Sequence, residues 1–194
     1  MYLLIYTIVG QAASKNKFVY SSGSSVYQIS TKVLKTGIKL CKNWELTIDL
    51  KIPNQPIKHW TNIFGIQQEN SVNMQTGSRL PCLQIHEKHK NHGNAFLKHS
   101  LYLNIASEIG NDPNYEFELI KWDPDRWTNL KISQISGLFK IEIDGKEYKK
   151  VQNPTPKEWN NVKIVMGNLY LPSKGWYYTA SKGEYKSFKL RTCF

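Results

Sequence analysis

The sequence predicts an all-β protein, an antiparallel two-sheet β-sandwich, and two patterns lead to this prediction. Residues 44–52 alternate strictly between apolar and polar side chains. A period of two is typical of a strand with one buried and one wet face. About a dozen short segments of this kind, separated by Gly, Pro and Asn turns, then favour a sandwich or a barrel.

The clearest single element is a hairpin between Trp127 and Gly167. Phe139, Ile141 and Ile143 alternate with polar residues, and Asp144-Gly145 follows at once. Asp-Gly supplies the positive φ angles that a two-residue hairpin turn requires. Its neighbouring strands are expected at residues 128–134, 147–151 and 161–167.

The remaining expected strands are marked by alternation or by β-branched and aromatic residues. They are residues 18–20, 26–30, 33–40, 60–67, 80–86, 101–105, 115–120 and 185–192. Residues 33–40 read as an edge strand that is broken at Gly37.

The chain length of 194 residues fits one domain with a short extension. We expect an apolar N-terminal segment over residues 1–15 and one sandwich domain over residues 16–194. Met1 to Gly10 is too short to span a bilayer. It reads equally as a signal remnant, a first strand or an arm that pairs with another sheet edge. No other segment is a candidate membrane span.

The net charge of +11 favours acidic partners, such as anionic glycans, nucleic acid or an anionic surface. The bases are scattered, and some, such as Lys189 and Arg191, fall on the outward phase of a strand. A solvated basic surface is therefore the simpler interpretation. No basic helix or RNA-binding segment is present, so nucleic acid is not expected as a partner.

Three cysteines are too few for a disulfide framework and lack metal-binding spacing. Cys41 lies just before one predicted strand, and Cys193 lies just after the last. Their sulfurs meet if those two strands are antiparallel neighbours, and we favour this pair. Cys82 in place of either partner, or three reduced buried thiols, are the open alternatives.

Six segments together resemble a known family. They are WELTIDL at residues 44–50, WTNIF at 60–64, LPCLQI at 80–85, LYL at 101–103, WTNLKI at 127–132 and FKIEIDG at 139–145. Their order resembles the strand series of laminin-G-like, concanavalin-A-like jelly rolls, over roughly residues 16–194. The resemblance implies two packed antiparallel sheets, an extracellular setting and binding of glycans or proteins. It implies no reaction and no cofactor, except that some members of the family bind calcium.

The same fold houses glycoside hydrolases, and Glu142-Ile143-Asp144-Gly145-Lys146-Glu147 matches the E-x-D-x-x-E pattern of one such family. Retaining hydrolysis needs two carboxyls about 5 Å apart that face one sugar. Here Asp144 belongs to the turn, Glu147 to the returning strand, and Glu142 to the outward phase. Glu116 and Glu118 read as an exposed acidic stripe. We therefore expect no enzyme, and a glycoside hydrolase is only a minor alternative.

Four histidines lie close together in the sequence and are candidate metal ligands. His86, His89 and His92 are three residues apart, and His99 is nearby, so zinc or copper is chemically possible. Lys88 and Lys90 would repel a divalent cation. Solvated loop histidines are the better interpretation, and no metal ligand is assigned.

The segment from Asn168 to Tyr185 is the predicted recognition loop. Its candidate ligand-binding residues are Tyr170, Lys174, Trp176, Tyr177, Tyr178 and Lys182. Flat rings offer stacking faces, and lysines engage carboxylate or sulfate groups. Some of the rings are equally expected to plug the core.

The sequence therefore predicts an extracellular, non-catalytic module that binds glycans, anionic glycans among them, through this loop. The alternative is a protein-interaction or assembly subunit that uses sheet edges and the N-terminal arm.

Overall fold

The computed structural model describes residues 18–53, 61–70, 80–87, 99–105, 115–119, 123–153, 156–167 and 179–194. In these ranges the chain forms fourteen strands, with no helix among them. The strands are β1 (Tyr20–Ser21), β2 (Tyr27–Gln28), β3 (Lys32–Leu40), β4 (Trp44–Lys51), β5 (Thr61–Gln68), β6 (Cys82–Glu87), β7 (His99–Ile105), β8 (Tyr115–Leu119), β9 (Thr128–Ile135), β10 (Leu138–Ile143), β11 (Lys146–Gln152), β12 (Trp159–Met166), β13 (Thr179–Ala180) and β14 (Glu184–Thr192).

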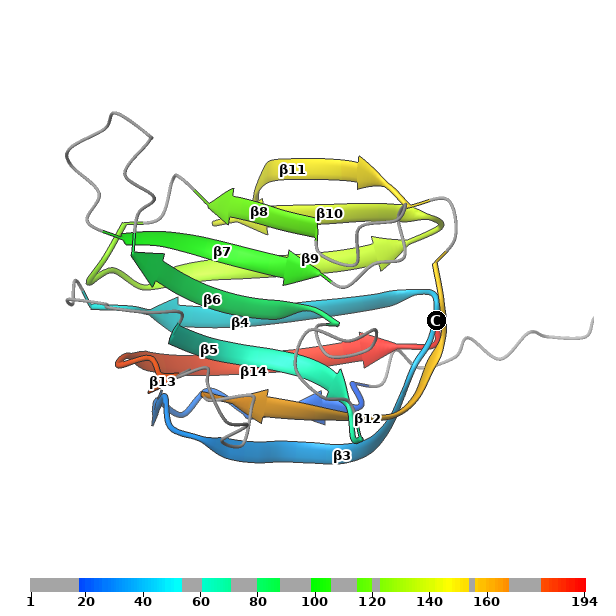
Figure 1. Cartoon of the computed structure of the whole chain (residues 1–194), viewed down its shortest axis with the longest axis horizontal. Helices are drawn as coiled ribbons and strands as arrows, with labels where there is room; N and C mark the ends of the chain where they lie inside the picture. The colour runs from blue at the N-terminus through cyan, green and yellow to red at the C-terminus, as the bar shows by residue number, and fades with distance from the viewer. Residues whose placement is uncertain are drawn as a thin grey trace, which may run out of the picture.

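The strands form two sheets that lie face to face (Figure 1). The first sheet has the order β1-β14-β4-β9-β10-β11, and β2 also pairs with β14. The second has the order β3-β12-β5-β6-β7-β8, and β13 also pairs with β5. All pairs are antiparallel except β13 with β5. The predicted all-β, two-sheet sandwich of jelly-roll type is therefore confirmed.

The core fills the space between the two sheets. In β4 buried and half-buried residues alternate without exception, as the sequence pattern predicts. Leu46 and Ile48 come from the first sheet, and Ile66 and Leu83 from the second. The rings of Phe64 and Phe188 meet across the sheets at 5.5 Å. Each such side chain contributes about 1.5–3 kcal/mol by its removal from water.

The β10–β11 hairpin forms at the predicted turn. Asp144 and Gly145 have φ angles of 50° and 74°, as a two-residue turn with matching strand twist requires. The side chain of Asp144 also accepts a hydrogen bond from the backbone N–H of Asn129 at 2.9 Å. The turn is thereby fixed to the neighbouring strand β9, which holds the register of three strands.

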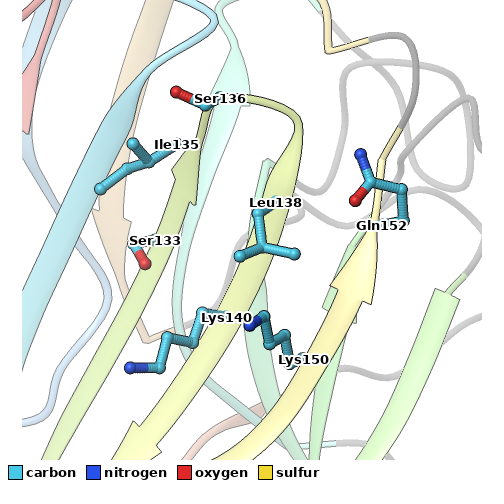
Figure 2. A pocket seen from close by; sticks show the side chains of 7 residues that line it. All are labelled: Ser133, Ile135, Ser136, Leu138, Lys140, Lys150 and Gln152. Atoms are coloured by element: carbon cyan, nitrogen blue, oxygen red, sulfur yellow. The ribbon is translucent and has the colours of Figure 1, made fainter.

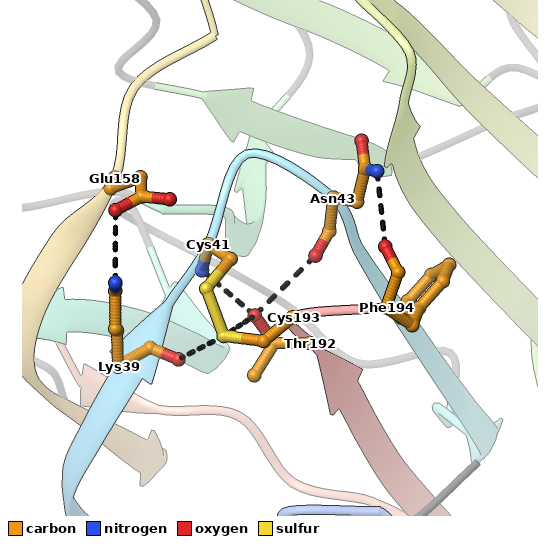
Figure 3. Close-up of a disulfide and its surroundings, with 7 residues drawn as sticks. All are labelled: Lys39, Cys41, Asn43, Glu158, Thr192, Cys193 and Phe194. Carbon is orange, nitrogen blue, oxygen red and sulfur yellow. Dashed lines mark hydrogen bonds and ion pairs between the residues drawn. A yellow bond between two sulfur atoms is a disulfide. The ribbon is translucent and has the colours of Figure 1, made fainter. Parts of the chain in front are cut away.

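A disulfide joins Cys41 to Cys193, and this is the pair favoured from the sequence (Figure 3). Cys41 directly follows β3 and lies three residues before β4, and Cys193 directly follows β14, the antiparallel neighbour of β4. The N–H of Cys41 donates to Thr192 Oγ1 at 2.8 Å, and Asn43 Nδ2 donates to the carbonyl of Phe194 at 3.1 Å. Cys82 is buried in β6 and takes no part in the disulfide.

Three details differ from the sequence-based expectations. β3 continues through Gly37, where the expected edge strand was to break. Its pairing with β12 is irregular there, and Gly37 has a φ of 66°, so the glycine forms a bulge inside the strand. β1 and β2 are only two residues long, and each pairs with a two-residue stretch of β14. The parallel β13 was not expected.

The expected N-terminal segment, residues 1–15, lies outside the described residues. Within the described ranges no helix is long and apolar enough to cross a membrane.

Candidate functional site

Most of the predicted recognition loop lies outside the described residues. This holds for Tyr170, Lys174, Trp176, Tyr177 and Tyr178. Lys182 is described and is exposed between β13 and β14.

Tyr185, the last ring of the same segment, is a core residue. It stacks on Tyr27 with ring centroids 5.3 Å apart, and the ammonium of Lys32 lies 5.5 Å from its ring centroid. Burial raises the pKa of the Tyr185 hydroxyl above its ordinary value. This ring therefore belongs to the core, one of the two roles expected for the aromatic residues of this segment.

The first sheet turns a charged face away from the core. Phe139, Ile141 and Ile143 of β10 point inward, so Leu138, Lys140 and Glu142 point outward. Ion pairs of alternating sign then cross five strands of this outer face, in what we call the charge ladder. From β14 to β11 its members are Arg191, Glu45, Lys131, Glu142, Lys140 and Glu147.

The distances in the charge ladder are unequal. Lys131 Nζ lies 2.9 Å from Glu45 Oε2 and 3.7 Å from Glu142 Oε2. Lys140 Nζ lies 3.0 Å from Glu142 Oε1 and 3.5 Å from Glu147 Oε2. The hydrogen bond to Glu142 is the main reason that the pKa of Lys140 is raised above its ordinary value. Glu142 is thus held by two ammonium groups, and Glu147 by one.

An open depression of about 600 Å³ lies beside the charge ladder on the same face (Figure 2). Seven residues line it: Ser133, Ile135, Ser136, Leu138, Lys140, Lys150 and Gln152. They come from β9, β10, β11 and the turn between β9 and β10. In Figure 2 the two lysines lie at one end of the depression, and Ser136 and Ile135 at the other.

The strand register arranges six of these residues in two cross-strand rows. Ser133, Lys140 and Lys150 lie opposite one another across β9, β10 and β11. Ile135, Leu138 and Gln152 form the next row, two residues nearer the β9–β10 turn. One row offers a hydroxyl and two ammonium groups, and the other offers two aliphatic side chains and an amide. Together they suit a ligand with an apolar face and an acidic edge.

The carboxylates of the hydrolase-like motif lie on this face too. Glu142 and Glu147 are opposite each other across β10 and β11, as the hairpin prediction requires. Both carboxylates form ion pairs with Lys140. Asp144 is engaged in the turn, where it also accepts a 2.7 Å hydrogen bond from Arg126. All three carboxylates therefore have partners within the protein.

The other end of the same face carries a second polar cluster. Lys186 Nζ lies 4.4 Å from the ring centroid of Trp127, and Asn129 Nδ2 donates to Asp49 Oδ1 at 2.7 Å. These contacts connect β4, β9 and β14, where Lys186, Asp49 and Asn129 lie opposite one another.

The structure describes the backbone of two of the histidines considered as metal ligands. His86 lies in β6 and His99 in the adjacent β7, and His89 and His92 lie outside the described residues. Among the residues that the structure describes, no group of three or more His, Cys, Asp or Glu could hold a metal ion.

The depression was not predicted, although the sequence contains a signal for it. Ile135 and Leu138 are apolar residues on the outward phase of β9 and β10, and Ile135 is 36% exposed. Lys140 and Lys150 share that phase once the hairpin register is fixed by Asp144-Gly145. The sequence-based prediction placed the site on the aromatic residues of the segment from Asn168 to Tyr185 instead.

No family model matches the chain, and no curated protein does. Among solved structures, domain 4 of the extracellular arabinanase AbnA from Geobacillus stearothermophilus, in complex with arabinotriose, matches with a TM-score of 0.52 and 17% identity. The match covers 84% of this chain and 66% of that one.

Two further solved structures show the same architecture. The receptor-binding domain of botulinum neurotoxin mosaic serotype C/D has a TM-score of 0.50 and 11% identity, over 87% of this chain and 42% of that one. The alginate lyase AlyC3, in complex with dimannuronate, has a TM-score of 0.50 and 10% identity, over 88% and 76%. These similarities establish the fold: the chain is a β-sandwich of the jelly-roll type.

Proposed function

We propose that the protein is a non-catalytic glycan-binding module that takes acidic saccharides on the outer face of its first sheet. The observation that carries the proposal is the depression with its two cross-strand rows. A sugar ring has an apolar C–H face and polar edges, and a uronate or sulfated sugar adds an anionic group. Ile135 and Leu138 would contact the ring, and Lys140 and Lys150 would contact the acid group.

The predicted recognition loop extends this proposal. Trp176, Tyr177 and Tyr178, with Lys174 and Lys182, have the residue types that stack on sugars and pair with their acid groups. We propose the loop as a further contact for a long saccharide.

The comparisons support a carbohydrate ligand as a class. One neighbour was solved with arabinotriose and another with dimannuronate, an acidic disaccharide. Their sandwich folds match most of this chain, at 84% and 88%. Binding by this chain remains part of the proposal, because function is determined by the site and not by the fold.

Absence of catalysis is also proposed, on the chemistry of the carboxylates. A glycoside hydrolase needs one carboxyl as acid and another as nucleophile or base. Glu142 is engaged by Lys131 and Lys140, and Asp144 by Arg126 and a backbone N–H. These contacts favour a structural role for both carboxylates.

We further propose that the protein acts outside the cell. The Cys41–Cys193 disulfide supports this location, because disulfides persist mainly in oxidising compartments. The family resemblance of the sequence implies the same setting.

A glycan array with neutral, uronate-containing and sulfated oligosaccharides tests the proposal. We expect binding to acidic members only, weaker at high ionic strength because the contacts are charged. Lys150→Ala should weaken binding about tenfold or more, as expected for one charge-assisted contact of 1.5–3 kcal/mol. Lys35→Ala is the matched control, since Lys35 is exposed on β3 of the other sheet.

Two results would contradict the proposal. One is equal loss of binding in Lys35→Ala and Lys150→Ala, which would place the ligand elsewhere. The other is turnover of an acidic or neutral glycan that disappears in Glu142→Gln, which would make the protein an enzyme.

An assembly role is the second candidate, and one observation favours it. Phe18, Val19, Val26, Tyr27 and Val33 are exposed near the β1, β2 and β3 edges. If this apolar surface mediates assembly, Val26→Lys with Val33→Lys should turn an oligomer into a monomer in sedimentation analysis. A chain that is monomeric at every concentration before substitution would exclude this role.

A further inference from the structure

Lys140 and Lys150 form a like-charge pair in which, among the described residues, only Lys140 has carboxylate partners. They lie directly opposite each other on β10 and β11. Side chains in such positions have Cβ atoms about 4.5–5.5 Å apart, and like charges there are destabilising. Within the described ranges Lys140 has two carboxylate partners, whereas no carboxylate forms an ion pair with Lys150. An anion that contacts both ammonium groups would remove this repulsion.

The two carboxylates that hold Lys140 differ in how firmly they are bound. Glu142 lies 3.0 Å from the ammonium, contacts Lys131 as well, and has a side chain that is only 17% exposed. Glu147 lies 3.5 Å away, on the edge strand β11, and its side chain is 50% exposed. An exposed ion pair of this kind contributes little to stability because water screens both charges, so Glu147 separates easily from Lys140.

We propose that Glu147 is an internal competitor that occupies the ligand's place on Lys140. In this inference, which rests on the proposed acidic-glycan function, Lys150 contacts the arriving acid group first. The acid group then replaces Glu147 on Lys140, and Glu142 keeps its position because Lys131 holds it. The depression would thus bind strongly charged saccharides and reject neutral ones, which offer nothing in exchange for the Glu147 carboxylate.

The inference predicts an unusual gain of affinity. Glu147→Gln removes the competing charge and leaves the depression intact, so an acidic oligosaccharide should bind about two- to fivefold more tightly. Glu158→Gln is the matched control. It removes one carboxylate from a similarly exposed surface ion pair, with Lys39 at 3.0 Å, away from the depression. The control should change affinity little, because separated surface charges are screened by salt.

The test is isothermal titration of wild type, Glu147→Gln, Glu158→Gln and Lys150→Ala with an acidic oligosaccharide from the array. Tighter binding in Glu147→Gln alone, with weaker binding in Lys150→Ala, supports the inference. Weaker binding in Lys150→Ala without a gain in Glu147→Gln overturns the inference and leaves the proposed function standing. If Glu147→Gln and Glu158→Gln raise the affinity equally, the gain comes from the change in net charge, and the inference is overturned as well. If the wild-type protein binds no acidic oligosaccharide, both the inference and the proposed function are overturned.

Discussion

Gly167 shows how one residue without a side chain positions a whole edge of the sandwich. It follows β12 with a φ of 75°, and a Cβ built there would lie 2.8 Å from the backbone carbonyl carbon of Ser30 and the backbone nitrogen of Thr31. The chain that leads into β3 therefore packs directly on this glycine. Gly23 has nearly the same φ, 73°, but nothing lies within 4 Å of a Cβ at that position.

Substitution of these two glycines by alanine distinguishes the free-energy cost of backbone strain from the cost of a steric clash. Gly23→Ala should lose about 1–2 kcal/mol of unfolding free energy, the cost of a left-handed conformation for an L-residue. Gly167→Ala should lose clearly more, about 3–5 kcal/mol, because the backbone of residues 30–31 must also move. Urea denaturation measures both values. Equal losses would show that the close approach at Gly167 has no energetic consequence.

At the scale of elements, β14 brings the first and last strands of the described ranges together. It pairs with β1, β2 and β4, and the disulfide ties the residue after β14 to the residue after β3. The hydrogen bonds from Cys41 and Asn43 to residues 192 and 194 surround this cross-link (Figure 3). β14 pairs with β4, and β4 pairs with β9, which lines the depression. The disulfide therefore supports the strands that carry the depression.

Loss of the disulfide should therefore be costly. The two cysteines are 152 residues apart, and a cross-link that closes so long a loop is worth roughly 3–5 kcal/mol in chain-entropy terms. We expect the double variant Cys41→Ser, Cys193→Ser to lose about this much in urea denaturation. A reductant should lower the stability of wild type and leave the double variant unchanged. Wild type that is insensitive to reductant would contradict this prediction.

At the scale of the whole molecule, the fold was largely predictable and the site was not. Residues 44–52 and 139–143 alternate so regularly that only a half-buried strand fits them, and Asp144-Gly145 fixes the hairpin. The bulge at Gly37 escaped prediction, because a glycine in a strand pattern signals a break and a bulge equally.

The depression escaped prediction for a different reason. Its residues are 19 positions apart at the extremes, Ser133 and Gln152, and they meet only through the register of three strands. The net charge favours acidic partners but does not indicate where they bind. Some of the lysines, such as Lys131 and Lys140, form ion pairs within the charge ladder. The aromatic residues of the segment from Asn168 to Tyr185, by contrast, predict a binding loop from residue type alone.

The central claim is that an acidic saccharide binds over β9, β10 and β11 on the outer face of the first sheet. Mapping of backbone amide NMR shifts during titration with such a saccharide tests it most directly. The account predicts that the largest shifts fall on Ser133, Ser136, Lys140, Lys150 and Gln152. Shifts confined to the second sheet, or saturable binding that leaves these five amides unmoved, would contradict it.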